Sequence, residues 1–379
     1  TYKILYNDAV AMTGGQPVEG QLTVPEIALQ VFGEGVKKIV VVSDEPDKYP
    51  AGTSFPAGVT IRHRDDLDAI QRELRGIEGC TVLIYDQTCA AEKRRRRKRG
   101  TFPDPAKRVF INELVCEGCG DCSVKSNCLS VEPRETEFGR KRQINQSSCN
   151  KDFSCVNGFC PSFVTVHGGE LRKAPRAGRK GAEGQDPFAK LPQPEQPRLD
   201  TPYSILVTGV GGTGVVTIGA LLGMAAHIEE KGVSVLDMTG LAQKGGGVLS
   251  HVRIAPKPDD LKAVRIAAGG ANVLIGCDMV VAGSPDALNR VSNGGTRAII
   301  NVHETPTADF TLNPDASFHS GAVKAAIRRA AGDNLSEFIE ATDIATMLMG
   351  DAIATNLFML GYTGQRGLIP ISLAALEQA

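Results

Sequence analysis

The chain has 379 residues, of which 42% are hydrophobic, and its 42 basic side chains nearly balance 43 acidic ones. This length and composition predict a globular protein of two or three domains, and the near-zero net charge excludes recruitment of nucleic acid or an acidic membrane by a global field. No run of about 18 apolar residues and no signal-peptide pattern is present, so we expect a cytoplasmic protein. The chain starts at Thr1 directly in a strand-like stretch, and we therefore expect a fragment.

The first 110 residues alternate between two kinds of stretch. Short runs rich in β-branched and aromatic residues are followed by stretches of helical apolar spacing. The runs predict strands at 2–7, 38–43 and 80–85, and the helical spacing predicts helices at 24–32 and 65–74. This alternation is typical of half of a doubly wound α/β layer.

The first strand ends at Asn7-Asp8 and is followed by the small-residue turn Thr13-Gly14-Gly15-Gln16. An amide oxygen after a strand and bare backbone amides in a turn suit Mg²⁺ and a diphosphate. On the local pattern alone, an ordinary turn is the favoured interpretation.

A run of seven Lys and Arg side chains occupies residues 93–99. It lacks interleaved aromatic residues and stands in a neutral chain, so a solvated helix end or a subunit contact is favoured over a nucleic-acid patch. The six histidines have no acid or nucleophile at recognisable spacing, and we interpret them as structural.

Seven of the ten cysteines lie between residues 116 and 160, which indicates metal ligation rather than disulfides in a chain without an export signal. Cys116, Cys119 and Cys122 have C-x2-C-x2-C spacing, and Cys160, followed by proline, has the form of a remote fourth ligand. The pattern predicts a 4Fe-4S cluster. A zinc site is the alternative that paired C-x2-C spacing leaves open.

Gly118 and Gly120 would let the backbone wrap this cluster and direct amides at the sulfurs. Cys128, Cys149 and Cys155 would form a second cluster only if an unidentified ligand completes the set.

The three remaining cysteines lie outside this array. We interpret Cys80 and Cys277 as buried apolar thiols, and Cys89, beside the basic run, stays open.

Residues 202–379 repeat the order strand, glycine loop and helix, which predicts a second α/β domain. Strands are expected at 204–208, 233–237, 273–281 and 297–302, and a helix at 212–230. Residues 169–201 are rich in Pro, Gly and charged residues and are interpreted as a linker. We recognise no internal repeat in the chain.

Gly209, Gly211 and Gly214 match G-x-G-x-x-G between a strand and a helix, with Asp237 ending the next strand. The motif suggests a dinucleotide site. The same glycines equally serve the tight turn of a Rossmann-like layer, because residues 239–247 would crowd the ribose side.

Together these motifs resemble the fused indolepyruvate ferredoxin oxidoreductase family, within the thiamine-dependent 2-oxoacid:ferredoxin oxidoreductases, over essentially the whole chain. The segments that carry the resemblance are 7–16, 85–93 with the arginines that follow, 115–130, 148–167, 209–216 and 245–253. The resemblance implies an α/β chain of four parts. These are the C-terminal part of a thiamine-diphosphate-binding domain (1–110), a ferredoxin-type iron-sulfur insert (111–168), the linker (169–201) and a gamma-type domain incomplete at its C-terminus (202–379).

The resemblance also implies site residues. The Asn7 side chain and the Ala9 carbonyl would bind Mg²⁺, and Thr13, Gly14 and Gly15 would belong to the thiamine diphosphate segment. The gamma-type domain is not known to bind NAD in this family, so the dinucleotide interpretation is set aside. No catalytic residue is assigned.

The activity that the resemblance implies is oxidative decarboxylation of indolepyruvate or a related aryl 2-oxoacid with coenzyme A. Thiamine diphosphate would be the carbanion sink, and electrons would pass through the iron-sulfur cluster to ferredoxin. The implied partners are the remaining domains of the same chain and further copies in a homo-oligomer. The family's G-D-G thiamine motif and its domain with the pyrimidine-activating Glu are not in these residues, so we expect the fragment to be inactive alone.

Two other functions compete with this one. The first is an electron-transfer iron-sulfur module of an NAD(P)-linked oxidoreductase without 2-oxoacid chemistry. The second is an iron-sulfur nucleic-acid protein that binds through Arg94 to Arg99 in a salt-sensitive way.

Overall fold

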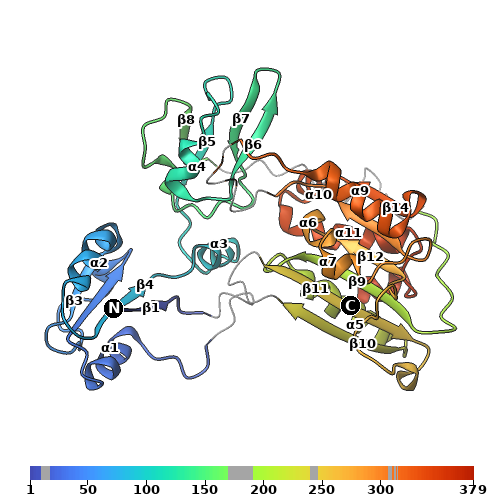
Figure 1. The fold of residues 1–379 in the computed structure, drawn as a ribbon, viewed down its shortest axis with the longest axis horizontal. Helices are drawn as coiled ribbons and strands as arrows, with labels where there is room; N and C mark the ends of the chain where they lie inside the picture. Colours follow the sequence, from blue (N-terminus) through green and yellow to red (C-terminus); the bar gives the residue numbers. More distant parts are fainter. Residues whose placement is uncertain (10–17, 170–190, 240–245, 306–309, 311–312, 314) are drawn as a thin grey trace, which may run out of the picture. The chain divides into compact units, whose positions relative to one another are not determined.

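The computed structural model describes residues 1–9, 18–169, 191–239, 246–305, 310, 313 and 315–379 (Figure 1). The chain divides into two compact units, Thr1–Asp104 and Pro105–Ala379, which are taken here one at a time. Within the described residues, no helix has both the length and the apolar character needed to cross a membrane.

The first unit is built on a four-stranded parallel sheet. Its strands, in the spatial order β1-β4-β2-β3, are β1 (Tyr2–Tyr6), β4 (Thr81–Asp86), β2 (Lys38–Ser43) and β3 (Thr60–His63). The strands expected from the sequence at 2–7, 38–43 and 80–85 are confirmed to within one residue. All the pairings are parallel, so the carboxyl ends of β1 and β4 lie side by side.

Helices cover both faces of this sheet. Alternate residues of β2 face opposite sides, so Ile39 and Val41 pack with α1 (Val24–Gly33), whereas Val40 and Val42 pack with α2 (Leu67–Arg75). A capping box between Thr23 and Glu26 starts α1. The unit also contains α3 (Ala90–Lys98).

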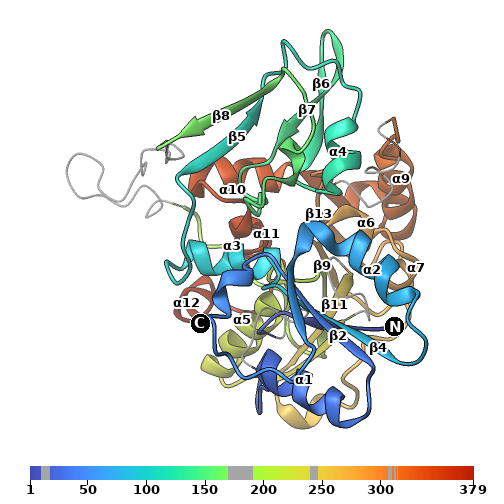
Figure 2. The same ribbon diagram turned by 90° about the vertical axis from the view of Figure 1, so that its left-hand side faces the viewer.

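The second unit begins with the cysteine-rich insert, residues 105–169. Its elements in chain order are β5 (Lys107–Ile111), α4 (Asp121–Ser126), β6 (Val131–Thr136), β7 (Gly139–Ile144), the 3-10 turn η4 (Ser154–Val156) and β8 (Phe163–His167). β5 pairs antiparallel with β8, and β6 with β7. Figure 2 shows α4 beside β6 and β7. The sequence showed little periodicity here, because the pairs are short and separated by cysteine loops.

The C-terminal domain contains a six-stranded mixed sheet. The strands, in the spatial order β10-β11-β9-β12-β13-β14, are β10 (Gly232–Thr239), β11 (Gly247–Ala255), β9 (Tyr203–Val210), β12 (Val273–Gly276), β13 (Arg297–Asn301) and β14 (Ser336–Ile339). β9, β12, β13 and β14 are parallel, whereas β11 is antiparallel to both of its neighbours.

Helices lie on both faces of this sheet, and alternate residues of β9 belong to different cores. Ile205 and Val207 pack in a cluster with α5, α11 and α12, and Leu206 packs in a second cluster with α6, α7 and α9. The helices of the domain are α5 (Val215–Ile228), α6 (Met279–Ala282), α7 (Pro285–Leu288), α9 (Ser320–Ala331), α10 (Ala341–Met349), α11 (Thr355–Gln365) and α12 (Leu373–Gln378).

One expected strand is shorter than the sequence suggested. The apolar run 273–281 is extended only as far as Gly276. Asp278 then caps α6 by accepting a hydrogen bond from the Val281 amide at 2.9 Å. An N-cap inside an apolar run therefore divides it into a strand and a helical turn.

Candidate functional site

The first cysteine loop, residues 112–122, connects β5 to α4. The Asn112 amide donates to the Ser162 carbonyl at 2.7 Å, and the Cys116 amide donates to the Asn112 carbonyl at 3.0 Å. Cys160, two residues before Ser162, is therefore tied to the base of this loop, and its Sγ lies 3.1 Å from the Ser162 Oγ. Cys160 thus lies near the start of the first loop, and its role as the remote ligand stays a prediction.

In this loop a backbone amide is directed at the sulfur of one of the loop's own cysteines. Gly118 has φ +78°, and its amide donates to the Cys116 Sγ at 3.4 Å. A Cβ at this position would lie 2.2 Å from the Arg140 carbonyl oxygen, so only glycine fits. Gly120 has φ +82° and is the N-cap of α4. Both glycines adopt the conformation for which the sequence singled them out.

Burial raises the pKa of the Cys122 thiol, and the nearby thiols of Cys116 and Cys119 raise it further. The three thiols of the first loop are therefore electrostatic neighbours. The guanidinium of Arg142, on β7, counteracts their effect on the Cys122 pKa. The sequence did not single out Arg142, because nothing in its local pattern shows that this cation is buried beside thiols.

The second cysteine loop, residues 145–155, connects β7 to η4. The Asn145 amide donates to the Ser130 carbonyl at 2.8 Å, and the Cys149 amide donates to the Asn145 carbonyl at 3.0 Å. The Lys151 amide donates to the Cys149 Sγ at 3.4 Å. The loop is thus tied to the segment just after Cys128.

Burial raises the pKa of the Cys155 thiol to about 12, with further contributions from the thiols of Cys128 and Cys149. The thiols of Cys128, Cys149 and Cys155 are therefore electrostatic neighbours too, and the assignment of the seven cysteines to two ligand sets stays a prediction. Within the described residues, no three or more His, Cys, Asp or Glu side chains are arranged to hold a metal ion. The type of donor nevertheless suits an iron-sulfur cluster, because backbone amides are directed at the sulfurs of Cys116 and Cys149.

The segment expected to bind Mg²⁺ and a diphosphate starts at the carboxyl end of β1. Asn7 follows the strand, and Asp8, at φ +51°, accepts two hydrogen bonds from Arg96 at 3.0 and 3.1 Å and one from Thr88 at 3.1 Å. Ala9 is buried. Thr13, Gly14 and Gly15 lie outside the described residues, so their role stays a prediction.

The basic run lies on α3, and several of its charges are paired within the first unit. Lys93 pairs with Asp44 at 2.5 Å, and Arg96 pairs with Glu92 at 3.1 Å as well as with Asp8. Glu92 is almost fully buried. These ion pairs give part of the run a structural role within the first unit, whereas the sequence favoured a solvated helix end or a subunit contact.

The glycine loop at the end of β9, residues 209–214, is in close contact with the chain around it. The Gly211 amide donates to the Gly246 carbonyl at 2.8 Å, and a Cβ on Gly209 would lie 2.6 Å from the Val215 side chain. Asp237 lies on β10, which is antiparallel to β11 and does not pair with β9. A dinucleotide fingerprint needs this acidic residue on a strand directly adjacent to the strand that precedes the glycine loop, whereas here β11 lies between β10 and β9. These glycines therefore serve packing.

The other thiols differ in burial. Cys277 is buried, as expected, and burial raises its pKa to about 12. Cys80 is exposed, so the expectation of a buried thiol is wrong there; it precedes β4 and lies outside the apolar face of that strand. Cys89 is buried at the start of α3.

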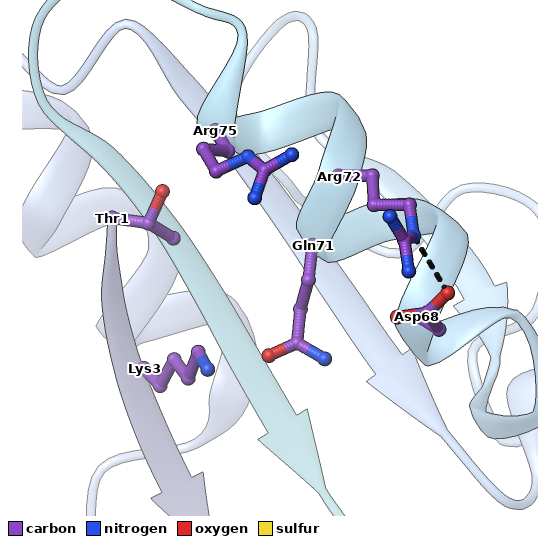
Figure 3. Close-up of a pocket in the computed structure, with 6 residues that line it drawn as sticks. All are labelled: Thr1, Lys3, Asp68, Gln71, Arg72 and Arg75. Carbon is purple, nitrogen blue, oxygen red and sulfur yellow. Dashed lines mark hydrogen bonds and ion pairs between the residues drawn. The ribbon is translucent and has the colours of Figure 1, made fainter.

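A hollow of about 450 Å³ lies against β1 and α2 (Figure 3). The residues that line it are polar, and two of them, Arg72 and Asp68, pair along α2 at 2.8 Å. It includes Thr1 and Lys3, at the amino end of β1, whereas Asn7 follows the carboxyl end. The hollow therefore does not coincide with the expected diphosphate segment.

Residues 204–379 match the protein family described as pyruvate ferredoxin/flavodoxin oxidoreductase. Two relatives are named indolepyruvate oxidoreductase subunit IorB. The protein of Archaeoglobus fulgidus is 29% identical over 182 residues, and that of Thermococcus kodakarensis is 27% identical over 176; each alignment covers 46% of this chain and 83% of the relative.

Among solved structures, the pyruvate oxidoreductase subunit PORC of Thermotoga maritima is 21% identical, and the alignment covers 47% of this chain and 83% of that one with a TM-score of 0.32. A structural likeness of this size carries no argument. The matched residues, 204–379, are those for which the sequence predicted a gamma-type 2-oxoacid oxidoreductase domain.

Proposed function

We propose that this chain is the electron-exit part of a 2-oxoacid:ferredoxin oxidoreductase that acts on indolepyruvate or a related aryl 2-oxoacid with coenzyme A. The observation that carries the proposal is the combination, in one chain, of a C-terminal domain from an oxidoreductase family and a cysteine insert with two sets of thiols. The choice of indolepyruvate rests on the names of the relatives.

In this proposal, Cys116, Cys119, Cys122 and Cys160 hold a 4Fe-4S cluster, which accepts and releases single electrons when present. The chain's own residues prepare the site. Gly118 directs its amide at the Cys116 sulfur, which lowers the cost of negative charge on that atom.

In the first unit, the Asn7 side chain and the Ala9 carbonyl would hold Mg²⁺, with Thr13, Gly14 and Gly15 next to the diphosphate of thiamine diphosphate, the carbanion sink of the reaction. Arg96, by pairing with Asp8, would fix the backbone between the two magnesium ligands. Partner domains or subunits would supply the rest of the thiamine site.

Metal analysis of anaerobically purified protein tests the electron-transfer part. We expect about four irons per chain for one cluster, or about eight for two, with matching labile sulfide. Cys116→Ser should remove the signal of the first cluster, whereas the matched control Cys80→Ser, at an exposed thiol outside the insert, should leave it unchanged. Zinc in place of iron would contradict the proposal.

Ferredoxin reduction tests the substrate. With its partner domains or subunits, thiamine diphosphate and coenzyme A, the protein should reduce ferredoxin when indolepyruvate is added. Reduction that requires NAD(P)H and ignores every aryl 2-oxoacid would favour the alternative of an NAD(P)-linked electron-transfer module.

A further inference from the structure

The two cysteine loops are one structural unit repeated. Each half of the insert contains, in chain order, a strand, a loop that begins with Asn, a helical turn, a remote cysteine and a second strand. The strands and helical turn are β5, α4 and β6 in the first half, and β7, η4 and β8 in the second. The corresponding residues are Asn112 and Asn145, Cys116 and Cys149, Gly118 and Lys151, Gly120 and Phe153, Cys122 and Cys155, Cys128 and Cys160, and Ser130 and Ser162. The expectation that the chain has no internal repeat is therefore wrong.

The backbone follows the same path in both loops. The residue two positions after the first cysteine has positive φ in each loop, +78° at Gly118 and +54° at Lys151, and its amide donates to that cysteine's sulfur at 3.4 Å. The residue four positions after it also has positive φ, +82° at Gly120 and +61° at Phe153, and caps the following helical turn. Such conformations are uncommon for Lys and Phe, so their recurrence at matching positions is specific.

This correspondence identifies the residue that the second set lacks. Three positions after the first cysteine, between the two left-handed residues, the first loop has Cys119 and the second has Asp152. Because the flanking backbone is alike, the Asp152 side chain leaves the loop from the position where Cys119 leaves the first.

Asp152 lies near the thiols of its own loop. It stands three residues after Cys149 and three residues before Cys155. Its Oδ1 accepts hydrogen bonds from the Ser154 amide at 3.1 Å and the Ser154 hydroxyl at 2.9 Å, and the side chain is exposed. A carboxylate is an anionic ligand with two oxygens, so one can accept from Ser154 while the other binds a metal.

We propose that Asp152 is the fourth ligand of a second cluster, with Cys128, Cys149 and Cys155 as the other three. The inference rests on the proposed function in one respect, that the insert holds iron and sulfide. A carboxylate oxygen is a harder ligand than a thiolate, so the iron that Asp152 binds is the most easily lost of the four.

The experiment compares Asp152 variants of the 379-residue chain, purified and reconstituted anaerobically. Asp152→Asn keeps an oxygen that can accept from Ser154 but removes the charge, so it separates the ligand role from the cap. Asp152→Cys restores the C-x2-C-x2-C spacing of the first loop. Asp121→Ala, at an exposed acid of the first loop that does not correspond to Cys119, is the matched control.

Iron content and electron paramagnetic resonance are the readouts. Wild type and Asp152→Cys should hold about eight irons per chain, whereas Asp152→Asn should hold about seven and show the signal of an oxidised three-iron cluster. Asp121→Ala should match wild type.

Two results would overturn the role of Asp152 and leave the proposed function standing. One is an Asp152→Asn protein with the iron content and spectra of wild type. The other is a wild-type protein that holds only about four irons, together with a Cys149→Ser variant of the same iron content. Wild type without iron in either set would instead overturn both proposals.

Discussion

The cysteine-rich insert and the C-terminal domain are stabilised in different ways. In the 65 residues from 105 to 169, the buried apolar side chains are Val109, Cys116 and Val131, whereas the C-terminal domain buries two extensive apolar clusters on the faces of its sheet. Burying an apolar side chain contributes about 1.5–3 kcal/mol, and ordering one backbone residue costs about 1–2 kcal/mol. The insert therefore needs another source of stability, and under the proposed function bound clusters would supply it.

Removal of iron should produce the largest difference in stability between the insert and the C-terminal domain. After chelation, we expect β5–β8 and β6–β7 to lose amide hydrogen-exchange protection, because little apolar burial is left to hold them. The strands β9 to β14 should keep their protection. Exchange measured by mass spectrometry with and without iron checks this, and an insert that stays protected without metal would break the comparison.

A methyl group added at Gly118 should disrupt the insert and leave the C-terminal domain unchanged. Gly118→Ala places a Cβ 2.2 Å from the Arg140 carbonyl at a residue with φ +78°, so the first loop cannot close. We expect the chain to lose about half of its iron, about four of eight atoms. Gly139→Ala is the matched control, because Gly139 has φ +86° but open space around it. Equal iron loss in both variants would show that backbone strain, rather than the loop contact, is responsible.

Loss of a core side chain should act on the C-terminal domain alone. Leu222 on α5 is fully buried, and Leu222→Ala should lower the free energy of unfolding of this domain by about 2–5 kcal/mol with no change in iron content. Met224 lies on the same helix but is 51% exposed, so Met224→Ala should change it by less than about 0.5 kcal/mol. Urea unfolding followed by circular dichroism, alongside iron analysis, measures both.

A smaller, pH-dependent effect should come from His251 on β11. Burial lowers its pKa to about 4, with help from the charges of Arg290 and Arg265, and its Nδ1 accepts from the Ile266 amide at 3.2 Å. A depressed folded-state pKa gives stability that is present above about pH 6.5 and is lost as pH falls toward 4. Between pH 7 and pH 5, the loss should be about 2 kcal/mol.

Urea unfolding of the C-terminal domain at several pH values checks this effect. His251→Gln keeps a side chain that can accept from Ile266 but does not titrate, so it should remove this part of the pH dependence. An unchanged pH profile in that variant would assign the effect to other groups.

The sequence predicted most where local pattern alone determines structure. The run 38–43 became β2 with the expected bounds, because a continuous apolar run between polar ends specifies a buried strand. The C-x2-C-x2-C spacing likewise predicted that the thiols of Cys116, Cys119 and Cys122 are neighbours. The strand at 273–281 was overestimated, because the capping role of Asp278 depends on the backbone around it.

The repeat within the insert was missed for a physical reason. In the first loop, glycine marks both left-handed positions, but in the second loop Lys151 and Phe153 adopt the same conformation without that mark. The residue three positions after the first cysteine is Cys119 in the first loop and Asp152 in the second, so the two loops differ in their cysteine spacing. Only the backbone dihedral angles and the amide–sulfur hydrogen bonds reveal the correspondence.

The pairing of β5 with β8 bears on how this chain is assembled from parts. Lys107, where the insert begins, lies opposite His167, where it ends, so the chain enters and leaves through neighbouring strands. A segment whose two ends lie close together can be inserted into a connection between two domains. We therefore expect that the insert could be transferred into a surface loop of another protein.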